Sequence, residues 1–352
     1  MAAPISSIPL WGQAWELTVQ YQTASGTASE VLTSNAWEPE ALRMTFEVLQ
    51  SMLPSPWWYA DIVVYNLDTP EIQNILLNAT WVTLKAGFQT GPTLASIIWD
   101  GPILQVLFDR ENVVDFRVTL HCVANPLVMN DIIGFSMGPF SSQAQLVSRM
   151  ASEVTLPPIN SANGTLSTYA TQALSAKQYP RGNTVFGKVG KYLTQIADDQ
   201  FISTWRDGSK VYMSEISNGT IQPTPNYVYS PPFPPNSTPS GLPANTTQSI
   251  IGTPRQTPFG VIFTVLLDPR LKVQLPPLVV QLVRTLITQI PIQVGETVAS
   301  PLSANLNFFV AQIRHTGDSR GNEWYTEVTG YNTTYASNLL DGVFAASNAG
   351  AS

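Results

Sequence analysis

The chain of 352 residues is poor in charge: Asp, Glu, Lys and Arg make up only 12% of it, against about a quarter in a typical globular protein. The 17 basic and 24 acidic residues give a formal net charge of -7, and no basic run occurs. Proteins that read DNA or RNA need clustered Lys and Arg to displace counterions from phosphates. The composition therefore predicts no specific nucleic-acid recognition.

Cysteine and histidine are almost absent, with Cys122 the only cysteine and His121 and His315 the only histidines. A single cysteine excludes a disulfide within the chain, and these three residues cannot assemble a Cys/His zinc cluster. His121 and Cys122 are neighbours in a predicted strand, so their side chains point to opposite faces and cannot act as base and nucleophile for each other. We predict no metal site and no cofactor.

Long uninterrupted apolar runs are also missing. The most apolar stretch, 258–292, is broken by prolines and basic residues, so it holds no run of about 18 apolar residues that could cross a bilayer. The first ten residues carry no positive charge and contain two prolines, which argues against a secretory signal. We predict no membrane segment.

No catalytic motif is complete. Residues 182–189, G-N-T-V-F-G-K-V, come within one residue of a phosphate-binding loop, but Val189 replaces the hydroxyl residue that would hold magnesium, and no buried strand precedes the motif. No Gly-x-Ser-x-Gly elbow accompanies His315, and nothing singles out two carboxylates as a pair. We predict that the chain is not an enzyme.

Two long β-hairpins of similar design are present instead. Near the end of the chain, alternating runs at 308–314 and 323–328 flank G-D-S-R-G-N, whose glycines and short polar side chains are expected to supply positive φ angles. Earlier, an apolar run at 97–108 leads through a charged turn into a second run at 113–122. Two such hairpins suggest two related β modules.

The predicted fold is mainly β with an α+β insert. Residues 10–130 read as a β-barrel of six strands with one inserted helix, and residues 259–335 read as a second β-barrel module. Helical spacing and an Asp-Gly turn between two short strands predict an α+β domain at 139–217. The proline-rich stretch 218–258 reads as a linker or long loop, and 336–352 as a tail.

Two ordered blocks of sequence resemble baseplate hub proteins of tailed bacteriophages. The first block resembles the first domain of that family and consists of four segments in order: Asp61-Ile-Val-Val-Tyr-Asn-Leu, Val82-Thr-Leu-Lys-Ala-Gly-Phe, Ile98-Trp-Asp-Gly-Pro-Ile-Leu and Arg110-Glu-Asn112. The last hairpin of the family is similar to Arg314-His-Thr-Gly-Asp-Ser-Arg-Gly-Asn-Glu-Trp-Tyr-Thr-Glu-Val328. The resemblance extends over most of 10–332, apart from the proline-rich stretch and the near phosphate-binding motif at 182–189.

This resemblance implies a structural virion protein. Its fold would contain two tail-tube-like β-barrel modules, and a homotrimer would present them as a six-fold-like ring. Such a ring joins a hexameric tail tube protein to a trimeric spike protein, contacts other baseplate or tape-measure proteins, and lets DNA pass at ejection. The resemblance also implies assembly in the host cytoplasm and a final location in the tail baseplate of the virion.

Two sets of residues carry these expectations. The candidate interface consists of charged and polar turn residues, namely Arg110, Asp318, Arg320 and Asn322. The candidate barrel anchors are aromatic: Trp99, Phe116, Phe309 and Trp324. Two other functions stay open from the sequence, a tail-tip enzyme that degrades the cell wall and a monomeric secreted β-sandwich that acts as a binding module.

Overall fold

The structure is a computed structural model, and it describes sixteen stretches of the chain: residues 12–23, 26–34, 42–52, 58–67, 78–88, 96–112, 115–124, 130–154, 156–200, 202–207, 210–214, 224–232, 246–257, 260–275, 277–283 and 307–332. The inserted helix predicted in the first module, which starts after residue 68, residues 284–306 of the predicted second module, and the tail at 336–352 lie outside these stretches.

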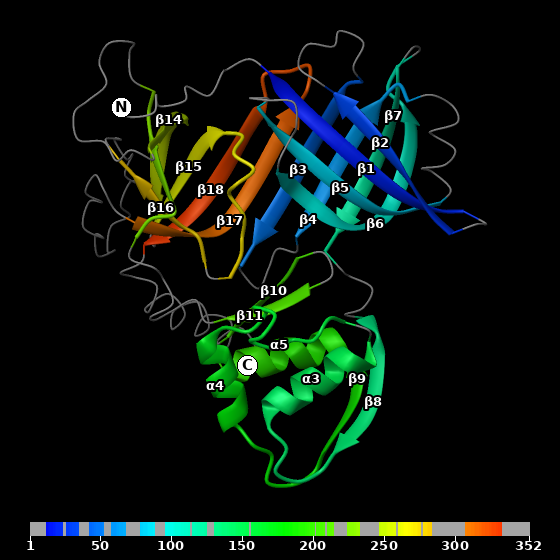
Figure 1. The fold of residues 1–352 in the computed structure, drawn as a ribbon, viewed down its shortest axis with the longest axis vertical. Helices are drawn as coiled ribbons and strands as arrows, with labels where there is room; N and C mark the ends of the chain where they lie inside the picture. Colours follow the sequence, from blue (N-terminus) through cyan, green and yellow to red (C-terminus); the bar gives the residue numbers. More distant parts are fainter. Residues whose placement is uncertain are drawn as a thin grey trace, which may run out of the picture.

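Seven antiparallel strands form the first part of the chain (Figure 1). They are β1 (Gln13–Thr23), β2 (Gly26–Ser34), β3 (Met44–Ser51), β4 (Tyr59–Tyr65), β5 (Ala79–Phe88), β6 (Ile97–Arg110) and β7 (Phe116–Val123), in the spatial order β2-β1-β5-β6-β7-β4-β3. Their apolar residues alternate, as in β4, where every second side chain is buried. The sequence predicted six of these strands and missed β2, whose polar residues alternate weakly.

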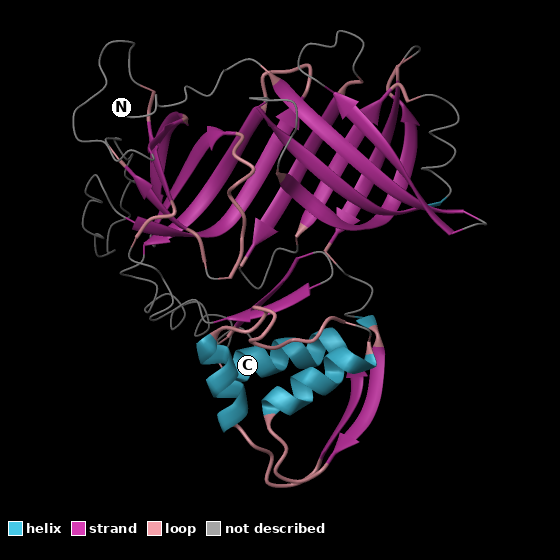
Figure 2. Cartoon of the chain, in the orientation of Figure 1, coloured by secondary structure: helices cyan, strands magenta, loops and turns pink. Residues whose placement is uncertain are grey.

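The middle of the chain is α+β. It contains β8 (Ile132–Met137), α3 (Gln143–Glu153), α4 (Thr168–Ala176), β9 (Asn183–Lys188), α5 (Val189–Asp199), β10 (Ser203–Asp207) and β11 (Lys210–Ser214). Ser142 begins α3 through a capping box with Gln145, and Ser167 caps α4. Helices α3 and α5 lie beside the β8–β9 pair, α4 packs against α3 and β11, and the three helices share a core of their own (Figure 2).

The last part of the chain returns to strands. These are β12 (Tyr227–Ser230), β13 (Thr246–Gln248), β14 (Ile250–Thr257), β15 (Gly260–Leu266), β16 (Val279–Leu282), β17 (Asn307–Asp318) and β18 (Trp324–Asn332). The prediction of a linker or loop at 218–258 is wrong for 227–230 and 246–257, which pair within the main sheet. Their backbone hydrogen bonds and the burial of residues such as Tyr229 outweigh the local preference of the neighbouring prolines for extended, unpaired chain.

Strand β17 joins the first and last parts into one sheet of 14 strands. One of its edges pairs with β18, while the other pairs first with β16 and then with β3. The change of partner falls at two adjacent residues: the Val310 N–H donates to the Leu278 carbonyl and the Ala311 carbonyl accepts from Met52 N–H, each at 2.8 Å. A single hydrophobic core runs under strands of both parts.

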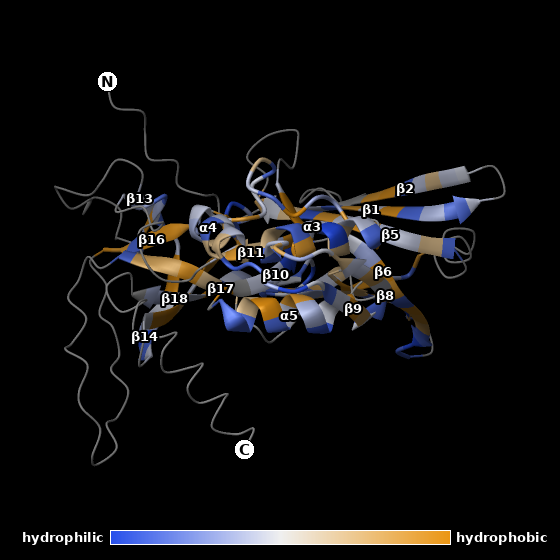
Figure 3. Cartoon of the chain, turned by 90° about the horizontal axis from the view of Figure 1, so that it is seen from below, coloured by the Kyte–Doolittle hydropathy of each residue, from blue (hydrophilic) through white to orange (hydrophobic). Residues whose placement is uncertain are grey.

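The predicted class, mainly β with a small α-containing insert, is confirmed. The α+β segment lies beside the sheet, and its β10–β11 hairpin is the element nearest to it (Figures 1 and 3). Trp205 of this hairpin belongs to the core of the sheet, whereas Val211 belongs to the core of the helices. The exact boundaries of the predicted domains stay a prediction. No helix among the described residues is long and apolar enough to cross a membrane.

Candidate functional site

The residues of the candidate interface lie at the ends of neighbouring strands. Asp318 at the end of β17 lies opposite Thr45 of β3, and the register continues through Val63 of β4 to Thr119 of β7, two residues from Arg117. Arg110 at the end of β6 lies opposite Phe116 at the start of β7. Residues more than 200 positions apart in the sequence therefore share one end of the sheet, which we call the rim.

An ion pair links the two ends of the sequence at the rim. Arg43 donates to both carboxylate oxygens of Asp318, with its Nη2 2.8 Å from Oδ2 and its Nε 3.2 Å from Oδ1. Partial burial raises the pKa of Asp318, but the hydrogen bonds from Arg43 and from the Arg320 N–H outweigh it, so the pKa lies below its ordinary value. Arg43 was missed from the sequence, since an arginine beside a strand carries no sign of a partner 275 residues away.

The remaining interface residues take different positions. The Arg110 guanidinium lies over the Phe116 ring, 4.8 Å from its centroid. Arg320 and Asn322 are exposed in the turn between β17 and β18. Asp318 accepts a hydrogen bond from the backbone N–H of Arg320, so its carboxylate fixes the turn as well as pairing with Arg43. The rim thus presents cations on a fixed backbone.

The glycines of this turn have another role than the one predicted. Neither Gly317 nor Gly321 has a positive φ, so the expectation that they supply left-handed conformations is wrong. A Cβ on Gly317 would lie 2.4 Å from the Phe46 ring, and one on Gly321 would lie 2.7 Å from the Asp318 carboxylate. Close approach of neighbouring side chains, rather than backbone conformation, requires glycine at both positions.

A second set of polar side chains continues the rim across β4, β6 and β7. Asn66, with a φ of 56°, donates to Asp115 and accepts from the Phe116 N–H. Asn112 donates to the other oxygen of Asp115, and together the two amides lower the pKa of that carboxyl. These bonds hold the turn between β6 and β7 in place, as Asp318 holds the turn between β17 and β18.

Three of the four candidate anchors are buried. Trp324 packs edge to face against Phe46 at 5.3 Å between ring centroids, and its Nε1–H donates to the Gly87 carbonyl. Trp99 is buried in the same core. Phe309 is buried in a small separate cluster with Tyr331, outside that core. Phe116 is half-buried and stacks on Phe108, so it does not anchor the core.

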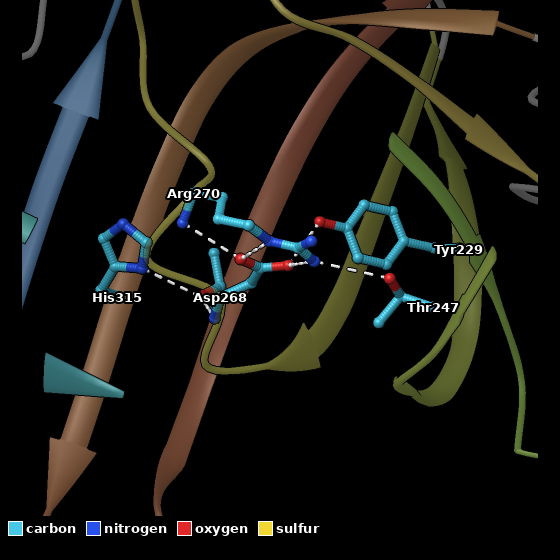
Figure 4. Close-up of polar contacts among 6 residues, drawn as sticks. Tyr229, Thr247, Asp268, Arg270 and His315 are labelled. Carbon is cyan, nitrogen blue, oxygen red and sulfur yellow. Dashed lines mark hydrogen bonds and ion pairs between the residues drawn. The ribbon is translucent and has the colours of Figure 1, made fainter. Parts of the chain in front are cut away.

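A buried polar network holds the last part of the sheet together (Figure 4). Asp268 accepts from the Tyr229 hydroxyl at 2.8 Å and from Nε and Nη2 of Arg270 at 2.8 and 2.6 Å. Its backbone N–H donates to the hydroxyl of Thr326, which also contacts His315 Nδ1 at 2.9 Å. Complete burial lowers the pKa of His315 to about 4, so this histidine is neutral near pH 7.

Several residues considered for catalysis lie within strands of the described chain. Cys122 is buried, and burial raises the pKa of its thiol. His121 faces Asp61 across β4 and β7, with 2.6 Å between Nδ1 and Oδ1. Residues 183–188 of the near phosphate-binding motif form strand β9 rather than a loop. Within the described parts of the chain, no group of three or more His, Cys, Asp or Glu could hold a metal ion.

Matches between this chain and known proteins come from solved structures. No protein-family model matches it, and no curated protein matches it in sequence. A tail protein from Neisseria meningitidis is similar over 92% of this chain and 97% of its own, with 11% identity and a TM-score of 0.49. A prophage MuSo2 tail protein from Shewanella oneidensis is similar over 91% and 97%, with 7% identity and a TM-score of 0.48. An Escherichia coli component of the type VI secretion system is similar over 84% and 75%, with 8% identity and a TM-score of 0.46. Similarity at this level assigns no function.

Proposed function

We propose that this chain is a structural protein of a bacteriophage tail, the hub of its baseplate. Three copies form a ring that joins the hexameric tail tube to a trimeric spike and lets DNA pass at ejection. The ring contacts further baseplate or tape-measure proteins. The protein is assembled in the host cytoplasm and resides in the virion, and its role is structural rather than enzymatic.

The observation that carries this proposal is the pairing of β17 with both β16 and β3. Because one strand belongs to both parts of the sheet, the two parts form a rigid unit rather than two beads on a linker. A ring in which three chains present six similar elements needs such a fixed relation within each chain. The resemblance of the two sequence blocks to hub proteins supports the same assignment.

The low charge of the chain agrees with extensive subunit contact. Burying a neutral hydroxyl or amide costs far less than burying an unpaired charge, so surfaces that stay in contact are poor in charge. The rim shows how the remaining charges are used: Arg43 is paired with Asp318, and Arg117 with Asp109 at 2.7 Å. Such pairs hold turns in position at the end of the sheet, where another protein can bind.

Light scattering at micromolar concentration and co-expression with the products of adjacent reading frames test the proposal. We expect three copies per particle, and a ring that binds a tail tube protein on one side and a spike protein on the other. A chain that stays monomeric in the presence of both partners would contradict it. A zymogram on peptidoglycan tests the enzyme alternative, for which a cleared band is required.

A further inference from the structure

Six of the nine large apolar side chains that are exposed among the described residues gather in two surfaces. The first, which we call the β6 surface, consists of Leu104, Leu107 and Phe108. The second, which we call the ribbon surface, consists of Ile132, Phe140 and Phe186 on and beside the β8–β9 pair. Clusters of exposed apolar residues of this kind mark binding sites for other proteins.

The β6 surface lies on a strand of which one edge, beyond Pro102, has no partner strand among the described residues. Strand β5 pairs with β6 only as far as Pro102, and beyond it the described residues pair with β6 through β7 alone. Phe108 lies opposite Val118 on the core face, while Leu107 lies opposite Thr119 on the outer face, so apolar side chains are exposed on both faces. A long exposed edge with apolar side chains invites pairing with another chain, and soluble monomers avoid it.

The ribbon surface carries the most exposed apolar side chains of the described chain. Phe186 is 77% exposed and its ring lies against Gly134, where a Cβ would be only 3.3 Å from the ring. Ile132, 69% exposed, lies on the same face of the β8–β9 pair. The Tyr192 hydroxyl bonds to the backbone of Phe186, which closes the strand edge there and leaves the face for contact.

Phe140 extends this surface beyond the end of β8. Its side chain is 71% exposed although its φ is 62°, a conformation that bulky residues rarely adopt. Its backbone N–H donates to the Tyr179 carbonyl at 2.7 Å, which places the turn beside the segment that joins α4 to β9. The protein therefore holds a large apolar side chain in solvent in a costly conformation, as expected where a partner covers it.

The two surfaces differ in charge. Residues 130–214 contain seven basic and five acidic residues, a net charge of +2, so the rest of the chain carries -9. Arg181, Lys188 and Lys191 are exposed close to Phe186 in sequence, and Lys188 lies opposite Ile132. The β6 surface ends at Asp109, Arg110 and Glu111, and Asp109 is paired with Arg117. The complementary charge is therefore that of the two parts as a whole: residues 130–214 of one copy, at +2, suit the rest of another copy, at -9.

We propose that the β6 surface of one copy binds the ribbon surface of the next copy. The two surfaces lie on different parts of the molecule, one in the large sheet and one in the α+β segment (Figure 1), so the contact is head to tail and each copy uses both. Contacts of this type close into rings, and the inference rests on the proposed trimer for the number of copies. It assigns a subunit contact to the α+β segment as well as to the sheet.

Two exposed double variants test this contact. Leu104→Ser with Leu107→Ser alters the β6 surface, and Ile132→Ser with Phe186→Ser alters the ribbon surface. Val31→Ser is the matched control, since Val31 is an exposed apolar residue of β2 outside both surfaces. Each double variant should dissociate at a concentration about thirtyfold higher than wild type or more, as loss of central interface residues does. The control should assemble as wild type does.

Mixing the two double variants distinguishes a head-to-tail contact from a symmetric one. Each variant keeps the surface that the other lacks, so the mixture should form pairs of two 38.4 kDa chains, seen by light scattering. Unchanged melting temperatures show that the variants are folded. If both variants assemble like wild type, or if their mixture forms no pair, the inference is wrong while the proposed trimer stands. A wild-type chain that never assembles contradicts both.

Discussion

Two aspartate–arginine pairs of similar geometry lie in different surroundings. Asp268 and Arg270 form a pair inside the last part of the sheet, and Asp318 and Arg43 form one at the rim. Both arginines are about half exposed, but the Asp268 side chain is only 6% exposed and also accepts from the buried Tyr229 hydroxyl. Asp318 is 17% exposed and its other partners are backbone N–H groups of its own turn.

The two pairs therefore have different roles: the buried pair stabilises the fold, and the rim pair holds a turn in position. A buried carboxylate whose partners come from several elements holds those elements together, and removing it leaves buried donors without acceptors. A pair at an exposed rim contributes little to stability, because water competes for both partners. The rim pair instead fixes the direction of a turn. Variants of the buried pair, of the rim pair and of the core beneath the rim test this difference.

The largest effect is expected at the core under the rim. Trp324→Ala should lower the free energy of unfolding by about 3 to 5 kcal/mol, since it removes a buried aromatic that packs on Phe46. Trp324→Phe, which keeps a ring there, should cost less. Thermal and urea melts give the values. A Trp324→Ala protein as stable as wild type would mean that the β17–β18 hairpin is not an anchor of this core.

The buried network should make stability depend on pH. His315 has a pKa of about 4 in the folded chain against an ordinary 6.5, so between these values the unfolded chain binds more protons. Stability is therefore full above pH 6.5 and falls as the pH drops toward 4, by about 3 kcal/mol from this residue. Urea melts from pH 7.5 to 4 should show a shallower fall for His315→Gln, and equal slopes would contradict the assignment.

Removing the charge of the buried pair comes next. Asp268→Asn should cost about 2 to 3 kcal/mol, less than for a fully buried pair because Arg270 is partly exposed and can reach water. Tyr229→Phe, which removes only the hydroxyl that donates to Asp268, should cost about 1 kcal/mol. Denaturant melts measure both. If Asp268→Asn is as stable as wild type, the buried pair does not stabilise the protein more than the rim pair does.

The smallest effects on stability are expected at the rim. Arg43→Ala should cost no more than about 1 kcal/mol, as most exposed pairs do, and Arg320→Ala should leave the melting temperature unchanged. In an assembly assay with the proposed tube and spike partners, Arg320→Ala should weaken docking, because a charge exposed at an interface acts mainly on association. If the Arg320→Ala variant assembles normally, Arg320 is not part of the interface.

Local sequence patterns were enough to predict most of the strands and the presence of helices in the middle of the chain. Alternation predicted six strands within 10–130 and both long hairpins, and helical spacing predicted helices within 139–217, where α3, α4 and α5 lie. The sequence also pointed to Trp99 and Trp324, both of which are buried. These predictions succeed because alternation, helical periodicity and capping depend on residues close together in the chain.

Only the tertiary structure decided which distant residues meet. The pairing of Arg43 with Asp318, the exchange of partners along β17 and the network around Asp268 join segments tens to hundreds of residues apart. It also turned 227–230 and 246–257 into strands, placed Phe309 outside the main core, and gave Gly317 and Gly321 their role. Register between distant strands depends on the complete sheet, so no local pattern in the sequence records these contacts.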